Sequence, residues 1–340
     1  MSRKLIIAFG AVLLTSVAVP ITTASAHTAT RRDPVVRVLN NSALDGLGSG
    51  STIGPDGALY VTNGTAGTLV RIDVRTGRAR VVGRGLPKKV IEIGGPMDVS
   101  FIGKQAFVMV SIAGVDVGGP DVAMGIYRLE RDGTFSLFAD IGAWSAAHPP
   151  VDPDWFLAEG VQYSMDVWRD GFLLTDAHHA RVLRIDSRGN ISALVAFDDT
   201  DVVPLGLETS HGKVYLTTAG PIPHLPSTAK IDLVGNDGSV TAVGGWPTSY
   251  LGDRGLPVDV EVGDDGRLFG LLQGHWDRAP IDENEGTPAA PNTGEIVEVD
   301  RHGDFRALVD GLDQPTSMEV VDHVAYVVTL TGTILKVTGI

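Results

Sequence analysis

Short apolar runs separated by polar turns dominate the chain, and residues 164–197 show the pattern most clearly. Four runs rich in aliphatic and β-branched side chains alternate there with turn sequences such as Asp170-Gly171 and Ser187-Arg188-Gly189. The runs comprise residues 165–168, 172–175, 181–186 and 191–197. A four-stranded antiparallel sheet of this size cannot bury both of its faces alone, so we expect it to stack against further copies of itself.

Similar units recur at a spacing of about 40 to 50 residues, which is typical of a propeller built from four-stranded blades. Five units are complete, whereas the sixth, from Pro315, holds only three strands before Ile340. Residues 35–39 form an orphan strand before the first complete unit. Pairing this strand with residues 333–338 would close the ring and remove exposed strand edges. The sequence therefore predicts an all-β, six-bladed propeller of antiparallel blades, with the last blade closed by the N-terminal strand.

The beginning of the chain predicts an export signal. Arg3 and Lys4 precede an apolar run, and the small residues Ala24-Ser25-Ala26 form a cleavage site. A transmembrane anchor is the alternative, but a glycine and a proline interrupt the run. We expect a secreted protein with three parts: a signal peptide at residues 1–26, a flexible tether at residues 27–34 and a single propeller domain at residues 35–340.

Charge and cysteine content narrow the partners that the protein can have. The chain holds 41 acidic against 27 basic residues, a formal net charge of -14, and it contains no cysteine. An acidic domain repels nucleic acid and anionic lipid and attracts cations. The absence of cysteine excludes disulfides and thiolate sites. We expect a monomer without a transmembrane anchor, whose partner is a small molecule or an extracellular protein and not nucleic acid.

Connections of unequal length predict which face of the propeller is functional. In an antiparallel blade, the start of the innermost strand and the end of the second strand lie on one face. All of the long connections fall on this face, while the opposite face receives tight turns. Loops longer than the connection requires usually serve binding, because ordering each residue costs conformational entropy. The long connections span residues 114–123, 142–163, 219–228, 246–255 and 273–293.

Aromatic residues gather in the same loops, which hold four of the five tryptophans and several histidines. Aromatic rings beside polar groups are typical of a pocket for a ring-bearing or sugar-like ligand. The alternative is that each tryptophan pins its loop onto the disc. The ligand-binding residues that we predict are Trp144, Trp155, Trp246, Trp276 and His275, together with Asn63 and Gln273 near the ends of second strands.

Three aspartates are predicted to surround the mouth of the central channel. Asp98, Asp166 and Asp259 occupy what we take as the third position of the innermost strand in three units. Converging carboxylates raise one another's pKa unless a cation or hydrogen bonds compensate. Calcium or magnesium, which prefer oxygen ligands, would be one solution.

Two questions about these aspartates stay open at the level of sequence. Asp176 is a further candidate metal ligand, with Asn63 and Gln273 able to complete the shell. The alternative is that the aspartates accept hydrogen bonds from backbone amides and join adjacent blades without a metal. Glu208 and Glu319 fall two residues further along their strands, and we expect them to point elsewhere.

His178 and His179 are candidates for moving protons. They follow Asp176 in a short loop, and adjacent residues there cannot both face the axis. A neutral imidazole could act as a general base on a ligand held over the carboxylates. The alternative is a loop histidine without a role. The sequence contains no nucleophile elbow, phosphate loop, zinc-type histidine spacing or nucleotide fingerprint.

Three stretches carry a resemblance to a known family. They are DTDVVPLGLETSHGKVYLTTAGPIPHLPSTAKIDLV, LPVDVEVGDDGRLFGLL and GEIVEVDRHGDFRALVDGLDQPTSMEVV, of which PIPHLPS is the most specific part. Over essentially the whole mature chain, the sequence resembles the ScyD/ScyE family of exported proteins, named after proteins of a cyanobacterial sunscreen-pigment gene cluster. The resemblance implies an NHL-like or gluconolactonase-like propeller, with no established catalytic residues to carry over.

The chain also departs from that family's pattern. Asp98 and Asp166 stand where such repeats more often have glycine. The Glu159-Gly160 pair followed by Asp176 resembles the first metal ligand and following strand of gluconolactonase-like enzymes, but the Pro-x-Trp context is missing.

Two functions therefore remain open from the sequence. The first is an exported binding protein that uses its loop-rich face, with or without a divalent cation. The second is a metal-assisted hydrolase or lyase acting on a lactone or ester, similar to gluconolactonase or streptogramin lyase, in which the aspartates bind the cation and a histidine moves protons. Fold alone cannot choose between them.

Overall fold

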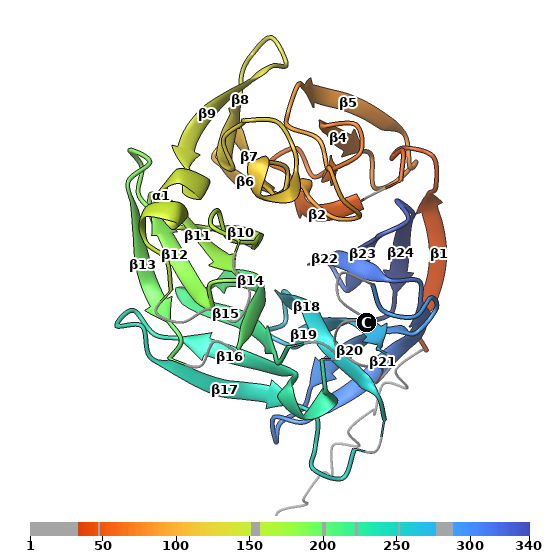
Figure 1. Ribbon diagram of the computed structural model, residues 1–340. Coiled ribbons are helices and arrows are strands. Elements are labelled where there is room, and N and C mark those ends of the chain that lie inside the picture. The colour runs from red at the N-terminus through yellow and green to blue at the C-terminus, as the bar shows by residue number, and fades with distance from the viewer. Residues whose placement is uncertain are drawn as a thin grey trace, which may run out of the picture. The chain divides into compact units, whose positions relative to one another are not determined.

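Six four-stranded antiparallel sheets are arranged around a central axis, as Figure 1 shows, so the predicted six-bladed propeller is confirmed. The computed structural model describes residues 33–46, 48–150, 157–198, 202–221, 224–250, 252–276 and 288–340. Asp33–Ile340 form one compact unit. The predicted signal peptide and most of the predicted tether lie outside the described residues. No helix in the described ranges is long and apolar enough to cross a bilayer.

In each of the first five blades, four consecutive strands run outward from the axis. Blade 1 consists of β2 (Gly48–Ile53), β3 (Leu59–Asn63), β4 (Thr68–Ile72) and β5 (Ala79–Arg84). Blade 2 consists of β6 (Gly95–Ile102), β7 (Gln105–Ser111), β8 (Gly125–Leu129) and β9 (Phe135–Asp140). Blade 3 consists of β10 (Gln162–Trp168), β11 (Gly171–Asp176), β12 (Arg181–Ile185) and β13 (Ile191–Ala196).

The remaining blades follow the same order until the ring closes. Blade 4 consists of β14 (Val203–Ser210), β15 (Lys213–Ala219), β16 (Lys230–Val234) and β17 (Val240–Gly245). Blade 5 consists of β18 (Arg254–Val262), β19 (Leu268–His275), β20 (Gly294–Val299) and β21 (Phe305–Leu312). Blade 6 consists of β22 (Pro315–Val321), β23 (Val324–Thr329), β24 (Ile334–Thr338) and the N-terminal β1 (Val35–Asn40).

Closure of the ring follows the predicted pairing. β1 runs antiparallel to β24, with Val35 opposite Thr338 and Val38 opposite Leu335. The innermost strands of neighbouring blades contact one another around the whole ring, including β22 with β2. The N-terminal strand therefore supplies the outer edge of the last blade.

The apolar core lies between neighbouring blades because side chains alternate along each innermost strand. In β18, Val260 is fully buried between sheets, whereas Asp259 and Glu261 on either side of it line the cavity on the axis. Aromatic rings join adjacent blades in the same way. Phe107 of blade 2 packs edge-on against Phe172 of blade 3, with ring centroids 5.0 Å apart. This alternation delivers every second side chain of an innermost strand to the central channel.

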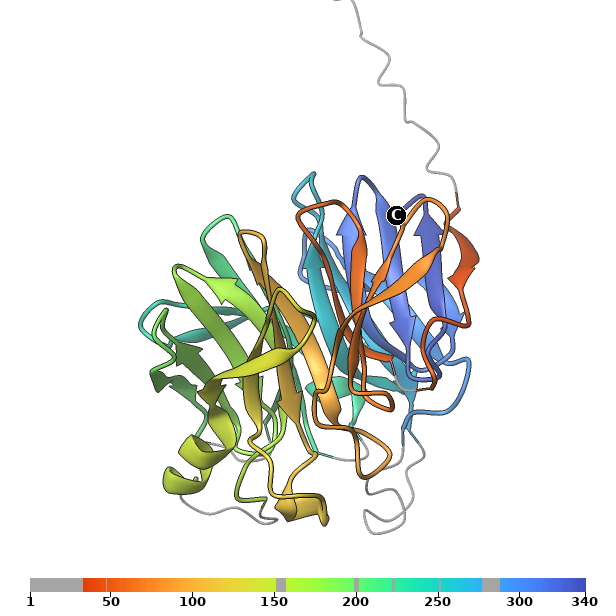
Figure 2. The same cartoon turned by 90° about the horizontal axis from the view of Figure 1, so that it is seen from above.

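The two faces of the disc differ as the connection lengths predicted. Figure 2 shows the helix α1 (Ile141–Ala147) and the described parts of the long connections projecting from one side, which we call the loop-rich face. Two short 3₁₀ helices, η1 (Val115–Val117) and η2 (Pro226–Thr228), also belong to these connections. Hairpin turns occupy the opposite side. In one of them, Gly77 takes a φ of 71° that permits its amide to donate to the carbonyl of Asp73.

Candidate functional site

A cavity of about 110 Å³ lies on the axis, and the innermost strands of all six blades line it. Ile93, Gln273 and Leu330 join the lining from the loop-rich side. None of the described lining residues is a lysine, arginine or histidine. Six lining residues carry carboxyl groups: Asp98, Asp166, Glu208, Asp259, Glu261 and Glu319. The cavity is therefore acidic without a basic residue to neutralise it.

The side chains that face the channel form two levels, and the upper level lies nearer the loop-rich face. Each innermost strand contributes one residue to this level. Around the ring, the residue types glycine, aspartate and serine occur in that order twice. The upper level comprises Gly50, Asp98, Ser164, Gly206, Asp259 and Ser317. The glycines permit close approach, since a Cβ on Gly50 would lie 2.2 Å from Oδ1 of Asp98. A Cβ on Gly206 would lie 2.5 Å from Cα of Asp259.

The two upper aspartates make matching hydrogen bonds to the next blade. Asp98 accepts from the backbone amide of Met165 at 2.7 Å and from the hydroxyl of Ser164 at 3.2 Å. Asp259 accepts from the amide of Met318 at 2.7 Å. Each aspartate also accepts from the amide that follows it in its own strand. These hydrogen bonds are the ones expected if the aspartates join adjacent blades without a metal.

The lower level lies two residues further along each strand, which corresponds to about 6.8 Å of strand length. It comprises Thr52, Ser100, Asp166, Glu208, Glu261 and Glu319. Its acids also join blades: the amides of Thr209, Val320 and Ile53 donate to Asp166, Glu261 and Glu319 respectively.

Two sequence predictions need correction at the lower level. Asp166 does not share the level of Asp98. The last pair of each hairpin shows this: Trp168 pairs with Gly171 in blade 3, and Ile102 pairs with Gln105 in blade 2. Counting back two residues from Trp168 and from Ile102 makes Asp166 equivalent to Ser100. The similar sequences PMDV and SMDV suggested the wrong alignment. The expectation that Glu208 and Glu319 point elsewhere is also wrong. Both line the cavity, since residues two apart in a strand share a face.

Burial raises the pKa of every carboxyl group in the cavity, and neighbouring carboxylates raise most of them further. The pKa of Asp259 rises to about 7 and that of Glu208 to about 8. Burial also raises the pKa of Asp98 and Asp166, although hydrogen bonds to both groups oppose the increase. The pKa values of Glu261 and Glu319 lie well above the ordinary value, because burial and nearby carboxylates act together. The channel therefore holds protons at neutral pH.

The placement of the acids does not fit direct coordination of calcium or magnesium. No group of three His, Cys, Asp or Glu side chains within the described ranges is arranged to hold a metal ion. Both oxygens of Asp98 and both oxygens of Asp259 already accept hydrogen bonds from backbone amides. Direct coordination by these carboxylates would have to use the second lone pair of each oxygen, beside the amides that join the blades.

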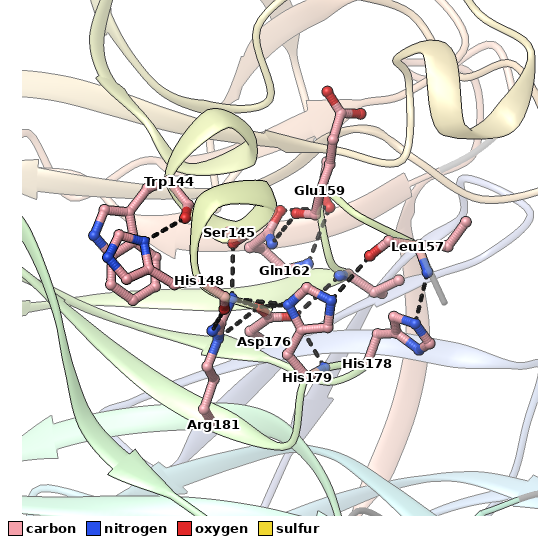
Figure 3. Close-up of polar contacts among 12 residues, drawn as sticks. Trp144, Ser145, His148, Leu157, Glu159, Gln162, Asp176, His178, His179 and Arg181 are labelled. Atoms are coloured by element: carbon pink, nitrogen blue, oxygen red, sulfur yellow. Dashed lines mark hydrogen bonds and ion pairs between the residues drawn. The ribbon is translucent and has the colours of Figure 1, made fainter. Parts of the chain in front are cut away.

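Asp176 is the last residue of β11 and lies in a different environment, among the polar partners drawn in Figure 3. Its fully buried carboxylate accepts from the Arg181 guanidinium at 3.0 Å and from the amide of Val161 at 3.0 Å. Nδ1 of His179 lies 3.2 Å from the same carboxylate. Burial alone would raise the pKa of Asp176, but His179 and Arg181 lower it below the ordinary value. Asp176 therefore forms an internal ion pair and does not line the cavity.

The two candidate catalytic histidines hold the segment at Leu157 (Figure 3). Nε2 of His178 accepts from the Leu157 amide at 2.8 Å, and Nε2 of His179 lies 2.9 Å from the Leu157 carbonyl. Burial and the neighbouring His179 lower the pKa of His178 to about 4. Neither histidine lines the cavity. The structure therefore does not bring them together with the channel carboxylates.

Of the two side chains expected to complete a metal shell, only one faces the channel. Gln273 lines the cavity, and its side-chain oxygen accepts from the amide of Ala289 at 3.1 Å. Asn63 is buried at the end of β3, where its side chain accepts from the amide of Ala66. It is absent from the cavity lining.

Two of the predicted ligand-binding tryptophans contact their own loops. Trp144 in α1 stacks on His148 with ring centroids 4.2 Å apart, and the guanidinium of Arg181 lies 5.0 Å from its ring. Trp246 stacks on Tyr250 at 3.9 Å and donates to the carbonyl of Arg254. These contacts correspond to the loop-pinning alternative, and neither ring lines the cavity.

The other predicted ligand-binding aromatic residues also contact protein groups outside the cavity. Trp276 is buried in the core and packs edge-on against His224, with ring centroids 4.7 Å apart. His275 lies 3.0 Å from the carboxylate of Asp253. Neither lines the cavity. Trp155 lies outside the described residues.

Sequence reasoning missed several cavity residues that a stricter use of strand periodicity could have found. Glu261 lies two residues after Asp259 in an alternating strand, which already places both side chains on one face. Ile93 and Leu330 carried no such pattern, because their positions depend on how the loops cross the channel.

Comparison with known proteins supports the fold and leaves the activity open. No protein-family model and no curated protein matches the chain.

Solved structures do match, and they are six-bladed propeller proteins. The gluconolactonase of Xanthomonas campestris is 12% identical with a TM-score of 0.59, over 93% of this chain and 93% of that chain. Virginiamycin B lyase of Staphylococcus aureus is 14% identical with a TM-score of 0.53, over 90% of this chain and 99% of that chain. The PQQ-bound aldose sugar dehydrogenase of Streptomyces coelicolor is 12% identical with a TM-score of 0.55, over 90% and 98%. At such identities the likeness establishes the fold alone.

Proposed function

We propose that the protein binds a small, positively charged ligand in the central channel, entering from the loop-rich face. The observation that carries this proposal is the cavity with six carboxyl groups and no lysine, arginine or histidine in its described lining. A narrow channel with walls of one charge sign concentrates the electric field and attracts counter-ions. A bound cation would favour the charged form of the carboxyl groups, whose pKa burial raises.

This arrangement suits an organic cation, because no group of three acids in the described ranges is placed to coordinate a metal ion directly. An ammonium group can interact with several carboxylates through hydrogen bonds and charge while their bonds to the backbone persist. Because the cation lowers the pKa of carboxyl groups that hold protons near pH 7, binding should release protons. Proton release is therefore a measurable property of the proposed site.

Calorimetric titration with charged and uncharged probes of the same shape tests the proposal. We expect tert-butylammonium to bind and tert-butanol not to bind, with protons released when buffers of different ionisation enthalpy are compared. Glu319→Gln and Asp166→Asn should each weaken binding by about tenfold, since each removes one charge from the cavity. Asp198→Asn, at an exposed position after β13, serves as the matched control and should bind like the unaltered protein. Equal binding of both probes would exclude the proposal.

We further propose that the protein is an exported binding protein of the ScyD/ScyE type. The sequence resemblance and the N-terminal pattern support this assignment, and the loop-rich face offers the surface that a binding protein needs. N-terminal sequencing of secreted protein should begin near His27. Retention of an uncleaved chain inside the cell would contradict it.

A metal-assisted hydrolase or lyase acting on a lactone or ester is the second candidate function. Its support is the fold shared with a gluconolactonase and a virginiamycin lyase. Metal analysis of the purified protein, followed by lactone and ester assays with and without chelator, tests it. Turnover that a chelator abolishes and that Asp166→Ala removes would favour this function over binding alone.

A further inference from the structure

The polarity of the side chains that line the channel changes along its axis. At the loop-rich end the lining includes the aliphatic side chains of Ile93 and Leu330, which precede β6 and follow β23 respectively. The two levels of acidic side chains lie deeper, on the innermost strands. A molecule that enters from this face therefore meets apolar side chains before carboxylates.

The loop that carries Ile93 exposes two further aliphatic side chains. Val90, Ile91 and Ile93 expose 42%, 46% and 38% of their surface, although they are aliphatic and close together in one loop. We call these three residues the apolar lip. Contiguous exposed aliphatic side chains mark binding surfaces more often than isolated ones do.

The apolar lip is held in place by its neighbours. The amide of Lys89 donates to the carbonyl of Gly64 at 2.9 Å. The next loop packs closely on it, since a Cβ on Gly119 would lie 2.8 Å from Cγ2 of Val90. These contacts hold the loop that carries Ile93 against its neighbours.

We propose that the ligand is an amphipathic organic cation, whose charged end enters the acidic channel and whose apolar part rests on Ile93, Leu330 and the apolar lip. This inference rests on the proposed function and adds the class of ligand. The order of the two surfaces along the axis fixes the orientation, because burying the cationic end among carboxylates leaves the apolar end at the mouth. An inorganic ion would leave the aliphatic border without a partner.

Three probes separate the contributions of charge and tail: methylammonium, hexylammonium and hexanol. Calorimetric titration should show that hexylammonium binds at least about tenfold more tightly than methylammonium, since each fully buried methylene group adds up to about fourfold in affinity. Hexanol should bind more weakly than hexylammonium, because it lacks the charge.

Variants of the lip locate the tail. Ile93→Ser should lower the affinity for hexylammonium about fivefold and leave that for methylammonium unchanged. Leu137→Ser is the matched control, because it alters an exposed aliphatic residue on β9, the outermost strand of blade 2. It should change neither affinity. Thermal unfolding of each variant verifies that it is folded.

The possible outcomes distinguish the two proposals. Equal affinities for methylammonium and hexylammonium would overturn this inference and leave the cation site standing. An equal loss for both ammonium probes in Ile93→Ser would also overturn it, because Ile93 would then support the channel and not the tail. If neither ammonium ion binds, or if hexanol binds as tightly as hexylammonium, the proposed function itself fails.

Discussion

Two groups of buried carboxylates in this propeller have opposite properties. Asp176 lies beside Arg181 and His179, and its pKa is lowered in spite of burial. The carboxyl groups of the channel have no basic neighbour among the described residues that line the cavity, and their pKa values are raised. Burial is common to both, so the presence of an internal cation accounts for the difference.

The comparison separates structural from functional acids. A buried carboxylate whose cation belongs to the same fold, as at Asp176, completes its own interactions and holds a loop in place. Carboxylates crowded around a cavity without a cation favour the binding of one from outside. Charge balance within the structure therefore identifies the channel, and not the histidine-rich loop, as the candidate site.

The largest expected effect is at the internal ion pair. Arg181→Met should lower the free energy of unfolding by about 3 to 5 kcal/mol, because it leaves the charge of Asp176 buried without its cation. Urea denaturation measures the loss. Arg71→Met, which removes a partly exposed ion pair with Asp56, is the control and should cost less than about 1 kcal/mol. Similar losses in both variants would contradict the distinction between the two groups.

The pH dependence of stability should show both groups at once. The raised pKa values of the channel carboxyls stabilise the folded protein fully below about pH 4. That contribution disappears as pH rises through about 7 for Asp259 and about 8 for Glu208. The lowered pKa of Asp176 acts in the opposite direction, since its contribution is present above about pH 4 and is lost below it.

We therefore expect unfolding free energy to fall by on the order of a few kcal/mol between pH 6 and pH 9 in the absence of ligand. Urea denaturation across this range measures the decrease. Glu208→Gln should reduce the slope, because it removes one titrating group from the channel. A flat profile from pH 6 to pH 9 would contradict this expectation, because it would mean that none of the channel acids titrates in that range.

Within the channel, replacing an acid that accepts hydrogen bonds from the next blade should cost more stability than replacing Glu208. Asp98→Asn should cost about 1 to 3 kcal/mol, because an amide has one accepting oxygen in place of the two that now accept from Met165 and Val99. Within the part of the chain that the structure describes, Glu208 accepts no hydrogen bond from the next blade, so Glu208→Gln should leave stability unchanged or increase it. Chemical denaturation at pH 8 compares the two variants. Equal costs would show that hydrogen bonds between blades do not distinguish these acids.

The smallest expected effect concerns the histidine loop. His178→Ala should cost about 1 kcal/mol through loss of the bond from the Leu157 amide. It should leave the affinity for an ammonium probe unchanged, because His178 does not line the cavity. Calorimetric titration of the folded variant provides the measurement, and a large loss of affinity would return this histidine to the site.

The sequence predicted the fold because each blade repeats the same local pattern, and because the orphan strand at residues 35–39 had one place to pair. It also predicted that Asp98, Asp166 and Asp259 face the channel. It did not predict the level of Asp166, since strand register depends on pairing across the hairpin and PMDV resembles SMDV.

Interactions between distant segments were the main limit of sequence reasoning. The sequence suggested Asp176 and His179 as site residues. In the structure, Asp176 pairs with Arg181 and His179 contacts the carbonyl of Leu157. Likewise, a tryptophan in a loop has the same sequence environment whether it stacks on its own loop, as Trp246 does, or faces a ligand. Composition locates such residues on one face but cannot assign their partners.

The pairing of β1 with β24 has a consequence for synthesis of the protein. The strand made first must wait for the strand made last, so the final blade cannot assemble until translation has reached the C-terminal residues. Val35, Val36 and Val38 remain without their neighbours throughout that interval. A chain that ends before β24 should therefore lack the outer edge of its last blade and leave its N-terminal strand accessible to proteases.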